Sequence, residues 1–507
     1  MKDYPIKWFW SKLMVASRSI NNIPDKFLEW AQNVRIYDGW IWPRLWKQLL
    51  TNSSIWTNNK GGFTMNSKLF QITNSKVWEV NTTTWVQTDR WSLWYDAFTD
   101  ISVYWNSIAI ITSDWQTPKF FNGTAVANIV TVPAWTTGIV EYCRNYSFIT
   151  KDNILYISRP ITAANPEFAY DWTWAWSQNI TYDSKIIGLK GTMNGLFVLL
   201  ENKVEYLWAN SLQNVSGSAT FISTPLGEGS APISNACIAA SWDKIFYISR
   251  NLQIQTINYL PGATNPSIWE LSARPVIGIK ELLSTVSSTQ TTAFAYYNEN
   301  DKLIEFHLRS INNLYNNYVI IYDLINDTWS VDTWKNYNYV VKFWYDYYWF
   351  SDINSSIYKD STGFSDAWVA IDTIIRTWGY TVGTILHKLW GWFFTAWAIW
   401  FITQLEYNVY IDWESVFQDV IDWNSFIWAW MGDVSWEAVS DEPLSGELSY
   451  TSQRQAFDKI CDEWRIYQSG KRISIEITSK SLVQDFIIDI LGFRYLPSAY
   501  SDVTDKF

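Results

Sequence analysis

The feature that most constrains the fold of this chain is a repeated β-hairpin. From Phe63 to Tyr358 one theme recurs, a short strand of alternating apolar and polar residues, a turn, and a second such strand. The pairs lie at residues 68–72 with 76–80, 107–112 with 119–121, 146–149 with 154–157, 195–200 with 203–207, 244–249 with 253–257, 303–308 with 318–323, and 347–351 with 356–358. Period-two alternation bounded by Asn, Asp, Ser, Gly or Trp is typical of hairpins.

The spacing of these hairpins indicates how they pack. They recur about every 40–50 residues, which is the spacing of propeller blades. A single hairpin cannot bury its apolar face, so neighbouring units must stack on one another. We therefore predict an all-β protein in which residues 61–369 form a β-propeller of about seven blades. A pair of β-sandwiches is the alternative, because regular hairpins also build that fold.

The two ends of the chain lack this repeat. Residues 1–60 are predicted to be an N-terminal extended arm with a tight turn, and residues 370–507 a C-terminal β-rich domain resembling a β-sandwich. In the latter, 405–411 and 415–421 predict a hairpin, and 472–478 and 486–495 predict two long strands. The apolar run 389–402 is shorter than the ~20 residues of a membrane helix. It predicts a buried strand pair if its Trp positions are glycines, or an exposed adhesive surface if they are not.

Tryptophan is strangely abundant and glycine scarce. The chain has 36 Trp and 21 Gly, whereas glycine is ordinarily about 7% of residues. Asp-Trp occurs at Asp114-Trp115, Asp171-Trp172, Asp412-Trp413 and Asp422-Trp423, and Ser241-Trp242-Asp243 separates two strand-like runs. These are hairpin-turn sites, where glycine readily supplies a left-handed backbone.

We hypothesise that many of these tryptophans are encoded by a codon that the source organism reads as glycine. Some bacterial lineages and their phages reassign UGA in this way. The alternative is a genuinely Trp-rich protein, such as a carbohydrate binder with stacking platforms. Trp329 and Trp349 lie within aromatic strand segments and are interpreted as true tryptophans.

Charge and cysteine content exclude several classes of protein. The net charge is −11, which argues against coating nucleic acid, because that role needs Lys and Arg to neutralise phosphates. Cys143, Cys237 and Cys461 are far apart, so they predict neither a disulfide scaffold nor a Cys-x-x-Cys metal site. The N-terminus lacks the apolar run of a signal peptide. We expect a protein that is soluble and cytoplasmic at synthesis, without metal or cofactor.

The sequence also contains little evidence for a catalytic site. Its two histidines, His307 and His387, have no partner at metal-ligand spacing. His307 alternates on a predicted strand and is interpreted as solvent-facing or sheet-lining. No Gly-x-Ser-x-Gly elbow supports a Ser-His-Asp triad. Carboxylates are plentiful, so paired acids alone are uninformative. We predict that the protein is not an enzyme, with no catalytic, cofactor-binding or metal-binding residue.

Several segments resemble the propeller-type tail and head–tail junction proteins of short-tailed bacteriophages, of the stabilisation or tail-nozzle type. Asn33-Val34-Arg35 followed by Asp38-Gly39 and Pro43-Arg44 is similar to the N-terminal phrase of that group. Residues 195–207 resemble one of its blades, and residues 472–495 resemble its closing β-domain. Trp40, Trp42 and Trp46 depart from the group where it has glycine. The likeness spans most of the chain but is loose.

The resemblance implies a virion component at the tail or head–tail junction that docks to portal, adaptor or tail subunits as a ring or as ring-attached copies. It would close or extend the DNA channel until the genome is ejected. It further implies location in the virion, with the host cytoplasm as the site of assembly, DNA at most passing through a channel, and no membrane. Interface hot spots are often Trp, Tyr and Arg. The candidate interface residues are therefore Arg35, Trp40, Trp42, Arg44 and Trp46 on the arm and Tyr337, Tyr339 and Tyr347 in aromatic loops. The alternative for these tyrosines is that they form edges of the blade core.

Two other functions fit the same residues. A carbohydrate-binding or glycan-cleaving propeller, such as a receptor-binding tail protein, requires true Trp platforms and two carboxylates facing each other across a cleft. The third interpretation is a cellular adaptor protein built on a propeller.

Overall fold

The computed structural model describes residues 2–5, 12–14, 27–51 and 59–361 with gaps, and the segments 373–377, 388–399, 404–422, 460–470, 473–479 and 486–497. These residues are predominantly β-strand, with one short helix, α1 (Ile277–Ser284), and the 3-10 turns η3 (Pro166–Tyr170) and η5 (Asn235–Cys237). The chain divides into two compact units. We call them the propeller unit (Leu49–Ile321 and Trp334–Asp360) and the terminal unit (Met1–Gln48, Tyr322–Thr333 and Ser361–Phe507).

Five blades of the propeller unit are four-stranded antiparallel sheets of consecutive strands. The strands are β7 (Asn59–Met65), β8 (Lys68–Thr73), β9 (Lys76–Val80) and β10 (Gln87–Ser92); β11 (Asp100–Tyr104), β12 (Ile108–Thr112), β13 (Lys119–Phe121) and β14 (Val126–Asn128); β15 (Val140–Cys143), β16 (Tyr146–Lys151), β17 (Ile154–Ile157) and β18 (Asn179–Thr181); β19 (Ile186–Gly191), β20 (Leu196–Leu200), β21 (Lys203–Asn210) and β22 (Thr220–Glu228); and β23 (Ile238–Ser241), β24 (Lys244–Ile248), β25 (Ile254–Asn258) and β26 (Ser267–Glu270).

A sixth blade combines strands from distant parts of the chain. It consists of β31 (Tyr337–Phe343), β32 (Asp346–Ser351) and β33 (Ile357–Ser361), with β6 (Trp46–Thr51) as its fourth strand. Leu50 of β6 packs against the apolar cluster of this blade, which includes Val341 and Tyr348. The last blade is therefore completed by a strand that precedes the first blade in sequence, which closes the ring.

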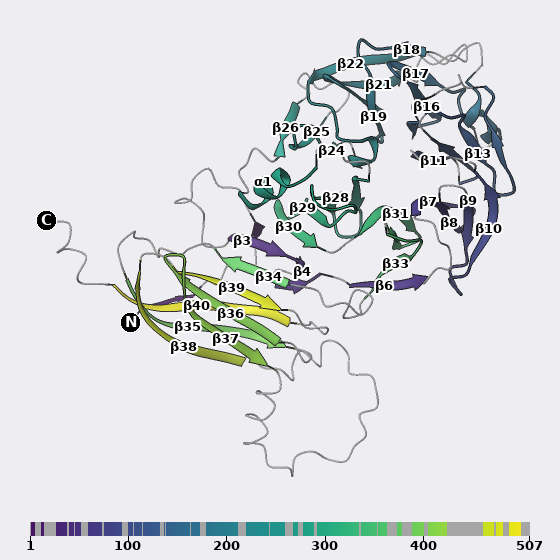
Figure 1. Ribbon diagram of the computed structural model, residues 1–507. Helices are drawn as coiled ribbons and strands as arrows, with labels where there is room; N and C mark the ends of the chain where they lie inside the picture. The colour runs from purple at the N-terminus through teal and green to yellow at the C-terminus, as the bar shows by residue number, and fades with distance from the viewer. Residues whose placement is uncertain are drawn as a thin grey trace. The chain divides into compact units, whose positions relative to one another are not determined.

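The inner strands of the blades contact one another in a closed order. The order is β7, β11, β15, β19, β23, β27 (Phe294–Asn298) and β31, and β31 returns to β7. Figure 1 shows the labelled inner strands β7, β11, β19 and β31 around a common centre. The predicted β-propeller is confirmed.

The predicted hairpins correspond to the second and third strands of the sheets. Thus 68–72 with 76–80 is β8 with β9, and 347–351 with 356–358 is β32 with β33. The expected count of about seven blades is corrected, because six are separate four-stranded sheets. The remaining hairpin, β28 (Leu303–Leu308) and β29 (Tyr318–Asp323), belongs to a ten-stranded sheet.

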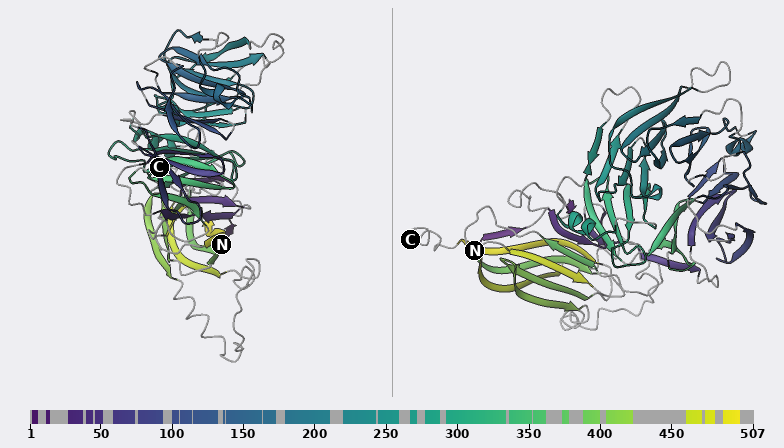
Figure 2. Two further views of the ribbon diagram at one scale, coloured as in Figure 1. Left: turned by 90° about the vertical axis from the view of Figure 1, so that its right-hand side faces the viewer. Right: turned by 45° about the horizontal axis from the view of Figure 1, so that its top comes forward.

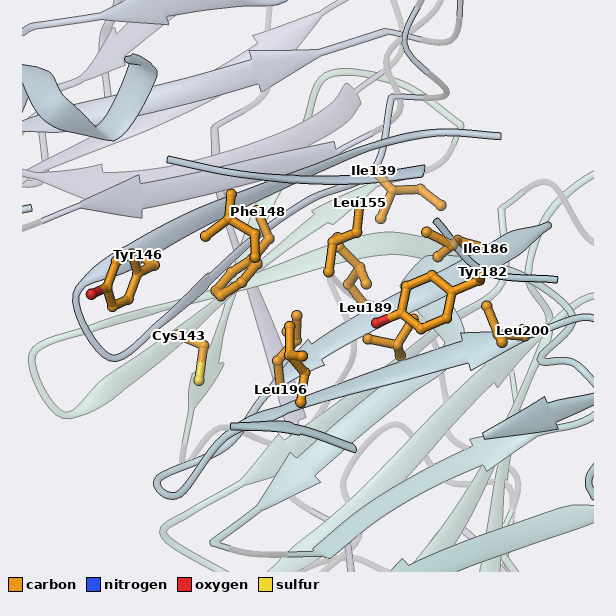
Figure 3. Close-up of a cluster of buried hydrophobic side chains, with 13 residues drawn as sticks. Ile139, Cys143, Tyr146, Phe148, Leu155, Tyr182, Ile186, Leu189, Leu196 and Leu200 are labelled. Atoms are coloured by element: carbon orange, nitrogen blue, oxygen red, sulfur yellow. The ribbon is translucent and has the colours of Figure 1, made fainter. Parts of the chain in front are cut away.

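Apolar side chains fill the spaces between neighbouring blades. In the cluster of Figure 3, Phe148 and Leu155 of one blade lie against Leu189, Leu196 and Leu200 of the next. These side chains are at most 2% exposed. Successive side chains of a strand point to opposite faces of the sheet, so each blade packs one face against the blade before it and the other face against the blade after it. Apolar burial is therefore shared among the contacts between blades, whereas a sandwich has a single core.

The terminal unit is built from both ends of the chain, and Figure 2 shows its strands from two further directions. One sheet has the order β38–β35–β40–β5–β4, with β1 on β40; the other runs β30–β2–β3–β34–β39–β36–β37. The strands are β1 (Lys2–Pro5), β2 (Lys12–Met14), β3 (Phe27–Gln32), β4 (Val34–Tyr37), β5 (Trp40–Pro43), β30 (Thr328–Thr333), β34 (Thr373–Thr377), β35 (Lys388–Ile399), β36 (Gln404–Ile411), β37 (Glu414–Asp422), β38 (Ile460–Gly470), β39 (Ile473–Ser479) and β40 (Phe486–Pro497).

Two predictions about the ends of the chain are corrected here. The expected N-terminal arm is folded into the chain's own sheets, with β4 paired to β5 and β3 to β34. The apolar run 389–402 is not a strand pair, because its described part is the single strand β35 between β38 and β40. The predicted hairpin of 405–411 with 415–421 is present as β36 with β37.

Candidate functional site

The two arginines predicted to bind an acidic neighbour bind an acidic residue of the same chain. Arg35 of β4 donates from both terminal nitrogens to the carboxylate of Asp332 on β30, at 2.9 and 2.7 Å. Arg44 Nε lies 3.8 Å from the same carboxylate, and all three side chains are buried. A bidentate guanidinium–carboxylate pair is among the strongest polar contacts in proteins.

Asn33 completes this cluster, which we call the arginine knot (Asn33, Arg35, Arg44, Asp332 and Thr333). Its Oδ1 accepts from Arg44 Nε at 3.1 Å and from the Thr333 backbone N–H at 3.1 Å. Its own backbone N–H donates to Val331 O at 2.8 Å. Asn33 also adopts a left-handed backbone, with φ of 55°, which asparagine tolerates better than most residues. The knot therefore fastens the N-terminal segment to β30, about 300 positions later in sequence.

Arg35 and Arg44 are thus internal fasteners, and the prediction that they bind another subunit is wrong. Their charge is satisfied and desolvated inside the terminal unit, so a partner could not reach it. Trp40 and Trp42 lie on β5 and Trp46 on β6, but their side chains lie outside the described residues.

The predicted tyrosines are also mainly interior. Tyr337 and Tyr347 are buried around Trp349, and Tyr347 Oη accepts from the Glu299 backbone N–H at 3.1 Å. Tyr339 is half-buried and packs against Val341 and Phe343. Of the two interpretations of Tyr337 and Tyr347, interface residues or edges of the blade core, the structure supports the second, since both side chains are buried in the blade.

His307 lies in the same aromatic core. Its ring stacks on Phe294 at 4.1 Å and lies 5.3 Å from Trp349, and its Nε2 is 3.4 Å from Glu305 Oε2. The side chain is fully buried, so the sheet-lining interpretation is correct and the solvent-facing one is not. His387 lies outside the described residues.

The polar group with the greatest capacity for acid–base chemistry was not predicted from the sequence. We call it the central cluster: Asp100 of β11, Glu141 of β15, Lys190 of β19 and Asn235 of η5. Asp100 Oδ2 accepts from Asn235 Nδ2 at 2.7 Å and from the Val140 backbone N–H at 3.2 Å. Three of its four residues are on inner strands, so the cluster lies where the blades converge.

The remaining contacts of the central cluster link further inner strands. Lys190 Nζ is 3.9 Å from Glu141 Oε2. Asn235 Oδ1 accepts from the Leu189 backbone N–H at 2.9 Å while its amide holds Asp100. A single asparagine therefore connects β11 to β19. We interpret the central cluster first as a brace between blades.

The pKa values of Asp100 and Glu141 are both raised above those of ordinary carboxyl groups. Burial, and to a smaller extent the neighbouring Glu141 carboxylate, raises the pKa of Asp100 to about 7. Burial also raises the pKa of Glu141, with Lys190 opposing the shift. A carboxyl group with a pKa near neutrality is able to exchange a proton at physiological pH. Among the described residues, no group of three or more His, Cys, Asp or Glu is arranged to hold a metal ion.

The shifted pKa gives a pH prediction. Folding raises the pKa of Asp100 from its ordinary 3.8 to about 7, so the folded state binds more protons between these values and stability falls as pH rises through that window. Asp100→Asn keeps an oxygen acceptor for the donated hydrogen bonds but cannot ionise. We expect the variant to lose less thermal stability than the wild type between pH 5 and pH 8, measured by circular dichroism. Equal losses in both proteins would contradict the assignment, and Asp89→Asn on the exposed β10 is the matched control.

The sequence contained one weak signal for the central cluster. Asp100 begins the inner strand Asp100–Tyr104, and Glu141 interrupts the otherwise apolar or aromatic inner strand Val140–Cys143. Their separation of 41 positions hides the pairing, because only the stacking of blades brings them together.

Comparison with known proteins gives similarity of fold only. No family model matches the chain, and no curated protein matches it. Among solved structures, the computationally designed Ika8 protein is similar at 8% identity and a TM-score of 0.39, over 62% of this chain and 100% of that one. The virginiamycin B lyase from Staphylococcus aureus is similar at 11% identity and a TM-score of 0.40, over 62% of this chain and 98% of that one.

Among the described residues, no helix is both long and apolar enough to cross a membrane.

Proposed function

We propose that the protein is a structural subunit of a bacteriophage virion, at the tail or the head–tail junction, and that it acts by docking to portal, adaptor or tail subunits. The observation that carries the proposal is the arginine knot. Asn33, Arg35 and Arg44 belong to the phrase through which the sequence resembles that group, and all three are buried in one hydrogen-bonded network. The phrase thus has a structural reason, namely fastening the N-terminal segment.

The closure of the ring supports a mechanical role. Strand β6 completes the blade of β31–β33, and Asn59 Nδ2 donates to Ser356 O at 3.0 Å and to Asn354 O at 3.1 Å across the first and last blades. Gln71 Nε2 adds a bond to Ser355 O at 2.9 Å. A ring closed by strand pairing and buried polar bonds resists opening under load, as a subunit around a DNA channel requires.

One finer feature belongs to this proposal. We treat the sheets of the terminal unit as a β-sandwich, because β38 lies against β36 and β37 of the other sheet.

Analysis of purified virions tests the proposal. Particles from the natural host lysate are banded on a density gradient, and peptides of this chain are quantified by mass spectrometry against the portal protein. We expect the chain in the particle band at a fixed ratio to portal, together with a ring or ring-attached density in electron micrographs. Its absence from intact particles, with portal present, would overturn the virion assignment, and an abundant host protein serves as the contamination control.

The central cluster favours glycan cleavage as the second candidate function. Such hydrolysis uses a carboxyl group of raised pKa as the general acid and a second, ionised carboxylate, and the raised-pKa group Asp100 has the Glu141 carboxyl as its neighbour. However, both Asp100 oxygens already accept protein hydrogen bonds, from Ile101 N–H and from Asn235 and Val140. We expect no release of reducing ends from host surface polysaccharide. Release by the wild type that disappears in Asp100→Asn/Glu141→Gln would establish the hydrolase instead.

A further inference from the structure

Tryptophan occupies backbone positions that suit glycine far more often than its frequency explains. In the described part of the chain, fifteen non-glycine residues have a left-handed backbone, and five of them are Trp, at φ of 59° (Trp85), 59° (Trp115), 56° (Trp242), 58° (Trp344) and 76° (Trp413). Tryptophan is 36 of 507 residues, so about one was expected by chance. Positive φ is unfavourable for a bulky residue because its Cβ approaches the backbone, whereas glycine adopts it freely.

The turn at Trp413 has the geometry of an Asp-Gly hairpin. Ile411 pairs with Glu414, so the turn consists of Asp412 and Trp413, and both have positive φ, at 49° and 76°. Two positive values define a type I′ turn, which strongly prefers Asn-Gly or Asp-Gly. Glycine at 413 would give the preferred pair.

Two other Trp residues open two-residue hairpin turns. Trp344 and Tyr345 connect Phe343 to its partner Asp346, and Trp242 follows Ser241, which pairs with Lys244. In each turn the Trp is the first central residue and has positive φ. Glycine is favoured at the first central position of type II′ turns.

Trp85 closes a longer hairpin loop that the chain uses elsewhere without Trp. Asn81 Oδ1 accepts from the Thr83 and Thr84 backbone N–H groups, and Trp85 N–H donates to Asn81 O at 2.7 Å. The loop after Asn298 repeats the side-chain bonds and ends at Lys302, with φ of 58°. The position therefore needs a left-handed backbone, although the Trp85 indole itself packs against the cluster that includes Tyr348.

The exposure of these side chains agrees with the backbone. The indoles of Trp115, Trp242, Trp344 and Trp413 are 47%, 70%, 68% and 56% exposed. Trp349 and Trp329 differ in both respects: they lie within strands β32 and β30, have no positive φ, and are 0% and 4% exposed. Trp349 Nε1 also donates to Asp360 Oδ2 at 3.1 Å. Of these six tryptophans, four thus form a turn class and two a core class.

We propose that positions 85, 115, 242, 344 and 413 carry glycine in the natural protein, through a codon that its source organism reads as glycine, and that positions 329 and 349 carry tryptophan. This assignment also bears on the carbohydrate-binding alternative, because it removes exposed indoles that a sugar platform would need. It stands independently of the proposed virion role, since it rests on turn geometry alone.

The coding DNA and the natural protein test the assignment directly. We expect UGA at the five turn positions and UGG at 329 and 349. Tandem mass spectrometry of the chain isolated from its source is expected to show glycine at the five positions and tryptophan at the two core positions. UGG codons or indole-containing peptides at 115, 242, 344 and 413 would overturn the proposal, whatever the codons elsewhere.

Stability of the printed sequence gives a second test that needs no natural material. In the full-length recombinant chain, Trp413→Gly is expected to lower the unfolding equilibrium constant of the terminal unit about tenfold, by removing the cost of a left-handed Cβ. Trp413→Ala removes the indole but keeps the Cβ, so it is expected to gain little. Equal effects of the two substitutions would show that the indole, and not the backbone, matters at this turn. A chain that does not fold leaves the codon and peptide readouts decisive.

Discussion

Asp332→Ala is expected to destabilise the terminal unit by about 3–5 kcal/mol, because removing one partner of a buried ion pair leaves an uncompensated charge. Asp332 accepts two hydrogen bonds from Arg35 and has Arg44 Nε at 3.8 Å. Without the carboxylate, the positive charges of the two buried guanidinium groups repel each other. The effect should appear as loss of hydrogen-exchange protection in β3, β4 and β30, where the N-terminal segment is fastened.

The partly exposed ion pair of Arg376 and Glu476 provides the control in the same unit. Arg376 Nε donates to Glu476 Oε2 at 2.6 Å, but the arginine side chain is 43% exposed. Glu476→Gln is therefore expected to cost at most about 1 kcal/mol, as for other solvated pairs. If Asp332→Ala and Glu476→Gln had similarly small effects, the arginine knot would not be the fastener of the N-terminal segment, and the main support for the proposed function would be lost.

The sequence predicted the blades because their information is local. Each hairpin, such as β8 with β9, shows period-two alternation and turn residues within about fifteen positions. The core residue Trp349 could be separated from the turn residues Trp115 and Trp413 in this way, but Trp172, which also follows Asp, is buried and has no positive φ. Trp349 lies between aromatic strand neighbours, whereas Trp115 and Trp413 follow Asp at turn sites.

What the sequence did not predict is the pairing of distant segments. Arg35 and Arg44 were interpreted as exposed anchors, because nothing near them in sequence reveals Asp332. The same holds for β6, whose partner blade begins near residue 337, and for Asp100 and Glu141. In a sequence, a charged residue that becomes buried cannot be distinguished from an exposed one until its partner is known. Here the partner is determined only when the ring closes and the terminal unit assembles.

Trp349→Ala is the second large effect that we expect, a loss of about 3–5 kcal/mol for the propeller unit, as for other buried aromatic residues cut to alanine. The indole is fully buried, with the rings of His307, Tyr337 and Tyr296 at 5.3, 5.6 and 6.0 Å. Truncation leaves a cavity among these rings and leaves Asp360 without the Nε1 hydrogen bond. Urea unfolding followed by circular dichroism measures the loss.

Two variants divide that loss into its causes. Trp349→Phe keeps most of the ring contacts but removes the Nε1 hydrogen bond to the half-buried Asp360, so we expect it to cost about 1 kcal/mol, the typical net contribution of one hydrogen bond. Trp344→Ala, five positions earlier and 68% exposed, is expected to change stability by no more than about 0.5 kcal/mol. A large cost at 344 or a negligible one at 349 would contradict the division into turn and core tryptophans. Comparing the two stability changes within one hairpin therefore tests whether the indole of Trp349 contributes to packing while the indole of Trp344 contributes nothing to the turn.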